Sequence, residues 1–570
     1  MLIKVNGLEY CELEFSYNHD IIEFIKNKVP ASYRQYNSQT NNWKIHQHFL
    51  PVFIDYLELK NIAYKIDVNE NIKPYYEHQQ SIFDFTDIKT GLYKHQKTGV
   101  HFAMTHKNFV IGDDQGLGKT LELLAFATSL KKKGAKHCLI ICGVAGNVWN
   151  WENEIKKHTN EKSYILGRKN NGNIGSGKDK FDSLHYPHEE FFYITNKETL
   201  RLLHKREGRR HIYPMVDIIN KLVEFGEISL IAVDECHKIK NPESSEGRAL
   251  LRLNCPRKAL MSGTIVMNNP LDLYMPLQWC GVIDQDYYHF KQDYCKFGGY
   301  GGTEIVGYKN TDKLKGLLSP IFIRRLKEEE LELPPKIMID EYIKLDDKQW
   351  IGYKHIENYV QKDIHKITFS DNPLSIMIHM REYLDDPSLV ELPTYDLSKI
   401  ESPKYSRLIE LLDNIFDNEN AQVIVYSQWS RVTNKIRDML SKIYGDVSYC
   451  DGNIYGEARM KEQDKFQEGK TKIIVGTIGA LGTGFTLNRA TDVIFIDEPW
   501  NMAIKNQAID RAHRIGTKYP VNVHTLICKD TIDERIHDLI LKKSKMADDL
   551  IITDDPKLTN DEIKYLCGMQ

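Results

Sequence analysis

The sequence lacks the features that mark secreted, membrane-spanning and zinc-binding proteins. Its ten cysteines are scattered over 570 residues and no CxxC pair occurs, which argues against a disulfide framework and a zinc site. No apolar run approaches the roughly 20 residues of a membrane span, and the chain does not open with the apolar region of a signal peptide. We therefore expect reduced thiols and a cytoplasmic protein, or a nuclear one in a eukaryote, with no membrane partner.

A strong excess of charge of either sign is also absent. The formal net charge is −3, so a nucleic-acid ligand would need a local basic face rather than the overall field. There is no internal repeat and no low-complexity tail. The 41% of hydrophobic residues is ordinary for a globular protein. The length predicts several domains, because a domain usually has about 100–200 residues.

The stretch 107–120, KNFVIGDDQGLGKT, joins a short apolar run to a glycine-containing turn and the start of a helix. Backbone N–H groups in such a turn, together with the helix dipole, form a cradle for phosphate. Lys119 would reach the terminal phosphates of ATP, and the Thr120 hydroxyl would bind Mg²⁺. Asp113 stands where the strict Walker pattern has glycine, so an ordinary glycine turn remains the alternative. The other predicted nucleotide-binding residues are Asp114, Gly116, Leu117 and Gly118.

A strict GxxxxGK match occurs elsewhere, at residues 172–178, GNIGSGK. No apolar strand precedes it, and Asp179 stands where a Ser or Thr would bind Mg²⁺. The whole stretch 167–180 is polar. We interpret this match as a surface loop without a nucleotide.

Residues 228–241, ISLIAVDECHKIKN, predict a buried strand that carries two carboxylates at its end. Asp234 would hold Mg²⁺ through water, and Glu235 would polarise the water that attacks the γ-phosphate. His237 is a candidate coupling residue rather than a metal ligand or a base. A lone strand ending in Asp-Glu is common, so the prediction rests on its combination with Lys119.

Further residues complete the predicted ATP site. The Gln96 amide can both donate to and accept from the adenine edge. Ser262 and Thr264 end an apolar run and would sense the γ-phosphate. Arg511 and Arg514 are three residues apart, which puts them on one face of a predicted helix. Two guanidinium groups there would stabilise charge on the transferred phosphoryl group, with a structural ion-pair helix as the alternative.

Two other stretches have polar groups suited to nucleic acid. Thr195 and Asn196 end a predicted strand, where side chains and backbone N–H groups could hold a phosphate backbone. A basic run follows, for which a solvated loop is the other reading: Lys205, Arg206, Arg209 and Arg210.

Residues 1–60 predict a small α+β module in which aromatic and basic residues alternate. Aromatic rings beside basic groups can stack bases and hold phosphates, or the rings can form the core of a small domain. Both interpretations remain open for the residues concerned, which are Tyr33, Arg34, Tyr36, Trp43 and Lys44.

An ordered set of motifs extends over about residues 90–545: YKHQ, DDQGLGKT, WNWENE, VDECHKIKN, MSGTIVMN, VIVYSQW, GTGFTLNRATDVIFIDEPWN and QAIDRAHRIG. The set resembles the Swi/Snf-related branch of superfamily-two helicase-like ATPases. The segment FKQDYCKF…LLSPIFIRRLKEEELELPPK is similar to the annealing-helicase subgroup, and about fifty N-terminal residues resemble its HARP module, which implies recognition of forked or single-stranded DNA.

The resemblance implies an α/β fold with two tandem RecA-like lobes, parallel sheets, helical insertions and a small N-terminal α+β module. The expected parts are 1–75 (HARP-like), 76–285 (ATP-binding lobe), 286–400 (insertions and linker), 401–545 (second lobe) and 546–570 (tail). It implies ATP and Mg²⁺ as cofactors, with Gln96 on adenine and with Arg511 and Arg514 as fingers from the second lobe.

The implied function is a monomeric translocase on duplex or forked DNA, with protein partners on that DNA. The alternative is a DNA-binding factor switched by ATP, or a remodeller of protein–DNA complexes, without processive movement. Four positions depart from the family's pattern without removing a catalytic group: Gly143 for Pro, Cys236 for Ala, Ile265 for Pro and Thr517 for Gln.

Overall fold

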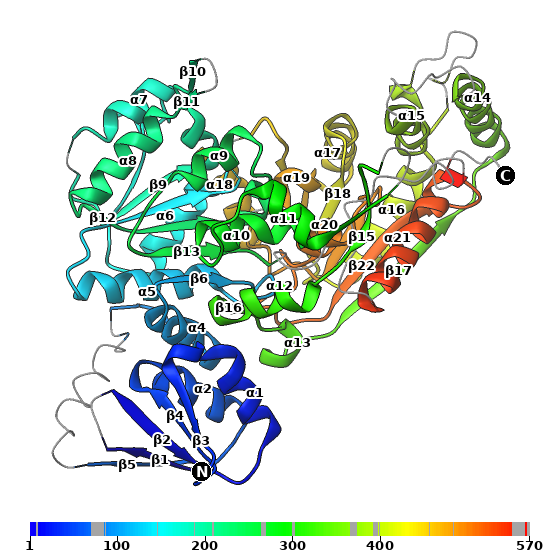
Figure 1. The fold of residues 1–570 in the computed structure, drawn as a ribbon. Coiled ribbons are helices and arrows are strands. Elements are labelled where there is room, and N and C mark those ends of the chain that lie inside the picture. The colour runs from blue at the N-terminus through cyan, green and yellow to red at the C-terminus, as the bar shows by residue number, and fades with distance from the viewer. Residues whose placement is uncertain are drawn as a thin grey trace. The chain divides into compact units, whose positions relative to one another are not determined.

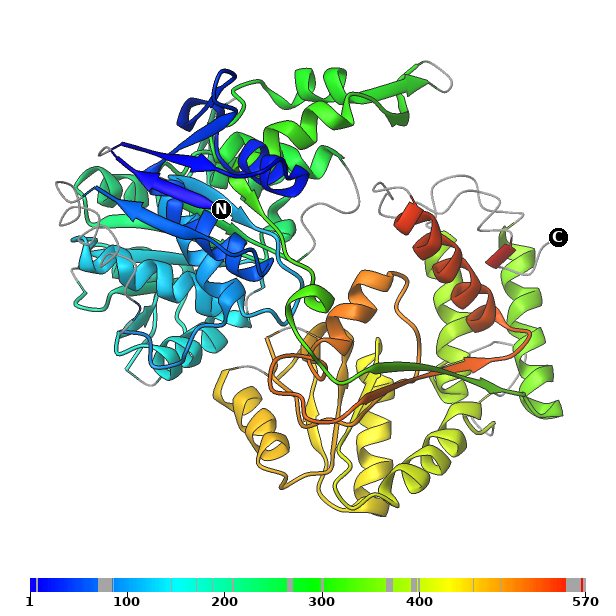
Figure 2. The same ribbon diagram turned by 90° about the horizontal axis from the view of Figure 1, so that it is seen from below.

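The computed structural model describes residues 1–6, 9–69, 85, 87–144, 146–170, 172–186, 188–207, 210–263, 270–298, 302–364, 373–390, 397, 400–454, 456–482, 484–549 and 565–566. The chain divides into two compact units, Met1–Glu330 and Leu331–Gln570 (Figures 1 and 2). The predicted linker region is shared between them, since residues 286–330 belong to the first unit and 331–400 to the second.

The N-terminal residues form a five-stranded sheet in the order β3-β4-β2-β1-β5. The three central strands, β4, β2 and β1, alternate between buried and more exposed residues, as expected for a sheet with one covered face. The covering helices α1 and α2 are visible in Figure 1, which confirms the predicted α+β module. The elements are β1 (Leu2–Val5), β2 (Tyr10–Glu14), α1 (His19–Lys28), β3 (Arg34–Asn37), β4 (Asn42–His46), α2 (Leu50–Leu59) and β5 (Lys65–Val68).

A seven-stranded sheet, entirely parallel, forms the centre of the first unit. Strands buried on both faces have continuous apolar runs, and HCLIIC and ISLIAVD are of this kind. In sheet order the strands are β16 (Phe322–Ile323), β6 (Asn108–Ile111), β13 (Lys258–Met261), β12 (Ile228–Asp234), β7 (His137–Cys142), β9 (Phe192–Asn196) and β8 (Ser163–Ile165).

Helices and two hairpins complete the first unit. The helices are α4 (Lys94–Thr105), α5 (Lys119–Lys132), α6 (Asn147–His158), α7 (Gly177–Ser183), α8 (Pro214–Glu224), α9 (Ser245–Leu251), α10 (Tyr274–Trp279), α11 (Tyr287–Tyr294), α12 (Thr311–Leu318) and α13 (Lys327–Glu330). The hairpins are β10 (Lys205–Glu207) with β11 (Arg210–Ile212), and β14 (Cys295–Gly298) with β15 (Glu304–Tyr308).

The second unit contains a six-stranded parallel sheet. In sheet order its strands are β17 (Lys336–Ile343), β22 (Val521–Cys528), β21 (Asp492–Phe495), β18 (Val423–Ser427), β20 (Ile473–Thr477) and β19 (Ser448–Cys450). Its helices are α14 (Asp347–Ile364), α15 (Pro373–Asp385), α16 (Pro403–Phe416), α17 (Ser430–Tyr444), α18 (Gly456–Gln467), α19 (Ile478–Leu481), α20 (Met502–Ile509) and α21 (Ile532–Asp549).

One predicted loop is present in the structure and the other is regular structure instead. Residues 172–176 of the strict GxxxxGK match form no helix or strand, as predicted, and α7 begins at Gly177. Ser176 is the N-cap of this helix and accepts from the Asp179 backbone N–H. The Asp179 carboxylate accepts in turn from the Ser176 N–H, so the two residues form a capping box rather than a phosphate loop. The basic run contributes to the β10–β11 hairpin, with Arg209 outside the described residues. Cross-strand hydrogen bonds therefore replace the predicted solvated loop.

Among the helices that the structure describes, none combines the length and the apolar character needed to cross a membrane. The nine cysteines in the described part of the chain are all buried, and none of them forms a disulfide there.

Candidate functional site

The loop between β6 and α5 contains two glycines in the left-handed region. Gly116 and Gly118 both have φ near +88°, a conformation that strains any residue with a side chain. A Cβ atom on Gly118 would also lie 2.3 Å from Nε2 of Gln96. The sequence therefore needs glycine here for the turn and for the close approach of Gln96.

Gln96 lies on α4 and is hydrogen-bonded to this loop. Its Nε2 donates to the carbonyl of Leu117 at 3.0 Å, and its Oε1 accepts from the Tyr93 backbone N–H at 3.0 Å. A carboxamide has a second N–H and a second lone pair. Gln96 therefore supports the loop through Leu117. Its predicted contact with adenine stays a prediction.

Lys119 is the first residue of α5, and its side chain folds over the loop. The ammonium Nζ donates to the carbonyls of Asp113 at 2.7 Å and Asp114 at 3.1 Å. Thr120 follows in the first turn, where backbone N–H groups and the helix dipole favour an anion. The structure thus brings the loop, the ammonium and the start of the helix together, and their binding of phosphate stays a prediction.

The strand β12 ends at Asp234, and the next residue turns sharply. Glu235 has φ +48°, and its N–H donates to Oδ1 of Asp234 at 2.9 Å. The indole Nε1 of Trp151 donates to the other oxygen, Oδ2, at 2.9 Å. Burial and the neighbouring Glu235 raise the pKa of Asp234 to about 6, while the Trp151 hydrogen bond and the charge of Lys119 oppose that rise.

The Glu235 carboxylate is linked to two other motifs, directly through Gln115 and by way of His237 through Ser262. Its Oε1 accepts from Nε2 of Gln115 at 3.4 Å, and its Oε2 lies 3.3 Å from Nδ1 of His237. The same nitrogen of His237 lies 2.8 Å from Oγ of Ser262. Burial lowers the pKa of His237 to about 4, so its ring is neutral at pH 7. Thr264, the other predicted sensor, lies outside the described residues.

The donor set suits Mg²⁺, which prefers oxygen ligands. Thr120 supplies a hydroxyl and Asp234 a carboxylate, and the neighbouring Oε2 of Glu235 is buried and accepts no hydrogen bond from any residue that the structure describes. A buried carboxylate oxygen without a donor needs a cation or a water molecule. The residues present therefore fit the predicted metal.

One departure from the family's pattern has a clear structural cause. The Gly143 N–H donates to the carbonyl of Asp234 at 2.8 Å, which a proline could not do. A Cβ atom at residue 143 would lie 2.5 Å from the carbonyl oxygen of Glu235. Gly143 therefore lets the chain after β7 approach the backbone of Asp234 and Glu235 closely. Cys236 is buried in the core beside them, and Ile265 lies outside the described residues.

The structure adds a buried ion cluster that the sequence did not predict. The Arg325 guanidinium contacts the carboxylates of Asp113 and Glu122, and neither carboxylate is exposed to solvent. The signal was present in two places: Asp113 replaces the Walker glycine, and IRRLK places two arginines directly after an apolar run. Nothing local connects them, since they are 212 residues apart.

In the second unit, Arg511 and Arg514 follow the helix rather than lying on it, because α20 ends at Ile509. The predicted shared helical face is therefore wrong. Both guanidinium groups still converge on one loop: Arg511 Nε donates to the carbonyl of Gly482 at 3.0 Å, and Arg514 Nη1 to the hydroxyl of Thr486 at 2.9 Å.

Thr517 holds the turn that carries these arginines. Its hydroxyl oxygen accepts from the Arg514 N–H at 3.0 Å and lies 2.6 Å from the Ala512 carbonyl, to which it donates. Gly516, with φ +96°, ends the turn. This departure from the family's Gln thus supplies a local clamp.

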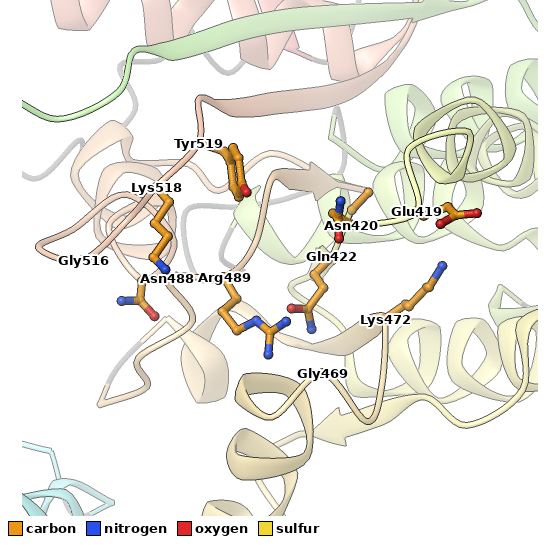
Figure 3. Close-up of a pocket in the computed structure, with 11 residues that line it drawn as sticks. Glu419, Asn420, Gln422, Gly469, Lys472, Asn488, Arg489, Gly516, Lys518 and Tyr519 are labelled. Carbon is orange, nitrogen blue, oxygen red and sulfur yellow. The ribbon is translucent and has the colours of Figure 1, made fainter.

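Neither arginine lines the pocket shown in Figure 3, which has a volume of about 440 Å³. The pocket lies at the amino ends of four parallel strands, β18, β20, β21 and β22, whereas open α/β sheets bind ligands at the carboxyl ends. Its charged lining consists of Glu419, Lys472, Arg489 and Lys518. It is therefore separate from the predicted phosphate-binding residues.

Several of the remaining nucleic-acid candidates have structural partners. Trp43 is 9% exposed and belongs to the core of the N-terminal module, where Tyr36 packs on it. The Arg34 guanidinium donates to the carbonyls at the end of α1, including that of Val29 at 2.7 Å. On the strand β9, the Asn196 side chain accepts from Lys180 at 2.9 Å. Core packing is thus the correct interpretation of Trp43.

Comparison with known proteins identifies the family. Residues 95–389 match the SNF2-related domain, and residues 403–516 match the helicase conserved C-terminal domain. The chain belongs to the SNF2-related family. With the two parallel sheets described above, these matches confirm the predicted α/β fold with two tandem RecA-like lobes.

SNF2-related relatives are similar over most of this chain. A candidate ATP-dependent helicase/translocase, YwqA of Bacillus subtilis, is 25% identical over 88% of this chain and 52% of its own length. The ATP-dependent DNA helicase DDM1 of Arabidopsis thaliana is 25% identical over 77% of this chain and 58% of its own. A solved SWI2/SNF2 ATPase core of Sulfolobus solfataricus with dsDNA is 24% identical, covers 85% of this chain and 99% of its own, and has a TM-score of 0.36. The chain spans about half the length of the curated relatives it matches.

Proposed function

We propose that this SNF2-related chain is an ATP-dependent translocase that moves on double-stranded or forked DNA and remodels or re-anneals it. The observation that carries the proposal is the convergence of Lys119, Asp234 and Glu235 at one edge of the first sheet. The names of the relatives, which pair ATP with helicase activity, support it further.

In this proposal each residue has a chemical role. Lys119 neutralises charge on the terminal phosphates, and Glu235 orients the attacking water and accepts its proton. Thr120 and Asp234 would hold Mg²⁺, which would supply positive charge to the phosphate oxygens. Arg511 and Arg514 of the second unit stabilise the charge that develops on the γ-phosphoryl group.

The first test is the steady-state ATPase rate without DNA, with a single strand, with a duplex and with a model fork. We expect strong stimulation by duplex or fork, and loss of turnover in both Lys119→Ala and Glu235→Gln. Equal rates on all substrates would overturn the DNA-motor proposal, and full turnover in Lys119→Ala would overturn the site.

A second test separates movement from switched binding. Displacement of a third strand from a triplex requires a translocating motor, and we expect it to depend on ATP and on Glu235. If the protein turns over ATP on DNA without displacing the strand, ATP only switches its affinity for DNA.

A further inference from the structure

Arg325 lies at the centre of the buried cluster that borders the nucleotide loop. Its Nε donates to Oδ1 of Asp113 at 3.0 Å, and its Nη2 contacts both oxygens of Glu122, at 3.0 and 2.8 Å. Its Nη1 donates to the carbonyl of His95 on α4. One side chain therefore connects the loop, the helix α5 that follows it and the helix that carries Gln96.

The backbone around Arg325 is bonded to the same loop. The Gly112 N–H donates to the carbonyl of Ile323 at 2.8 Å, and the Asp114 N–H donates to the carbonyl of Arg325 at 3.1 Å. The Lys327 N–H donates back to Oδ2 of Asp114 at 3.1 Å. Lys119 donates to the Asp113 and Asp114 carbonyls, so the segment 323–327 holds the two residues that position the catalytic lysine.

This segment is also where the chain leaves the first unit, which ends at Glu330. The N-terminal module contacts the residue just before this segment, because Lys28 at the end of α1 donates to the carbonyl of Phe322 at 2.6 Å. The Phe322 ring in turn fills the space above Gly112. Three parts of the molecule thus meet at one side of the nucleotide loop.

We propose that Arg325 is a positioning residue that sets the shape of the nucleotide loop through Asp113 and couples nucleotide binding to the segment joining the two units. In this proposal Asp113 stands in place of the Walker glycine because its carboxylate forms the ion pair with Arg325. The inference rests on the proposed ATP site, and it makes that loop dependent on a residue distant in sequence.

The test measures the affinity for a fluorescent ADP analogue, without DNA and without hydrolysis, in Arg325→Met, Arg325→Lys and Asp113→Asn. We expect Kd to rise at least tenfold in Arg325→Met and less in Arg325→Lys, which keeps the charge. Asp113→Asn keeps the shape of the carboxylate but removes its charge, so it tests the same ion pair if the Arg325 variants do not fold.

Lys404 offers a matched control in the second unit. Its ammonium is also buried between two carboxylates, at 2.7 Å from Asp385 and 2.7 Å from Asp533. Lys404→Met should lower the melting temperature while the Kd for the analogue stays within twofold. A destabilised Arg325→Met or Asp113→Asn with unchanged Kd would overturn the inference and show a purely structural cluster. Wild-type protein that binds no analogue would instead overturn the proposed function.

Hydrogen exchange gives a second readout that stability alone would not change. ADP should slow amide exchange in residues 322–330 of the wild type, and Asp113→Asn should abolish that protection. Equal protection in both proteins would exclude the coupling.

Discussion

The indole Nε1 of Trp151 donates a hydrogen bond of 2.9 Å to Oδ2 of Asp234, and this bond opposes the rise in the pKa of that buried carboxyl group. Trp151→Phe removes the donor and keeps the apolar bulk. The pKa of Asp234 should then rise further, and the acid limb of the pH profile of kcat/KM for ATP should move up by about one to two pH units, since a hydrogen bond to a charged group contributes roughly 1.5–3 kcal/mol.

Trp279 provides the control for this experiment. It is equally buried, and its Nε1 donates to the backbone carbonyl of Leu253 at 3.0 Å, away from the carboxylates. Trp279→Phe should reduce stability without moving the acid limb. An unchanged profile in Trp151→Phe would contradict the importance of the indole bond.

A proline at position 143 should disturb both the stability and the activity of the protein. Gly143→Pro removes the N–H donated to Asp234 and adds atoms where a Cβ would lie 2.5 Å from the Glu235 carbonyl oxygen. We expect a loss of stability of about 3 kcal/mol or more, together with lost ATPase activity. Chemical denaturation and ATP turnover measure the two effects. Gly91→Ala is the matched control, because a Cβ at residue 91 meets nothing within 4 Å. Wild-type behaviour in Gly143→Pro would refute the steric argument.

Lys28 predicts a pH dependence of stability. Burial lowers its pKa from 10.5 to about 8 in the folded protein. Between about pH 8 and 10.5 the unfolded chain therefore binds more protons at this residue than the folded one, so the contribution of Lys28 to stability rises with pH.

The comparison protein is Lys28→Met, which cannot titrate at this position. The free energy of unfolding of the wild type, relative to this variant, should increase from pH 8 to pH 10 by up to about 1.4 kcal/mol per pH unit. Below pH 8 the difference should be flat. A difference that is constant over the whole range would show that Lys28 remains fully solvated.

The hydroxyl of Thr517 can be tested with one variant that removes it and one that keeps it. Its hydroxyl bonds to Arg514 and Ala512 and so fixes the turn of the two arginines. Thr517→Val should lower kcat by about tenfold, the effect of losing roughly 1.4 kcal/mol of positioning, while Thr517→Ser should stay near wild type. Equal kcat values in Thr517→Val and Thr517→Ser would show that the Thr517 hydroxyl does not position the two arginines.

The sequence predicted the parts of the site that depend on local pattern. Lys119 follows a strand and a glycine turn, and Glu235 follows a buried strand, so each chemical group could be placed from its neighbours in the chain. Parallel strands bring their carboxyl ends to one edge, and the two motifs therefore meet there.

Contacts between distant segments could not be predicted in this way. Arg325 and Asp113 are far apart in the chain, and neither has a local pattern that names its partner. The helical periodicity around Arg511 was equally misleading, because hydrogen bonds to the loop of Gly482 and the hydroxyl of Thr517 favour a turn after Ile509. Tertiary hydrogen bonds outweigh helix propensity, which is worth less than 1 kcal/mol per residue.

The burial of all nine described cysteines has a practical consequence. Alkylating and maleimide reagents attack exposed thiolates, so these residues should stay unmodified in the native protein. Once Cys567, outside the described residues, is replaced by serine, a single cysteine introduced on each unit could carry a donor and an acceptor dye. Energy transfer between the dyes would then follow the separation of the two units through a catalytic cycle, without a cysteine-free background having to be built first.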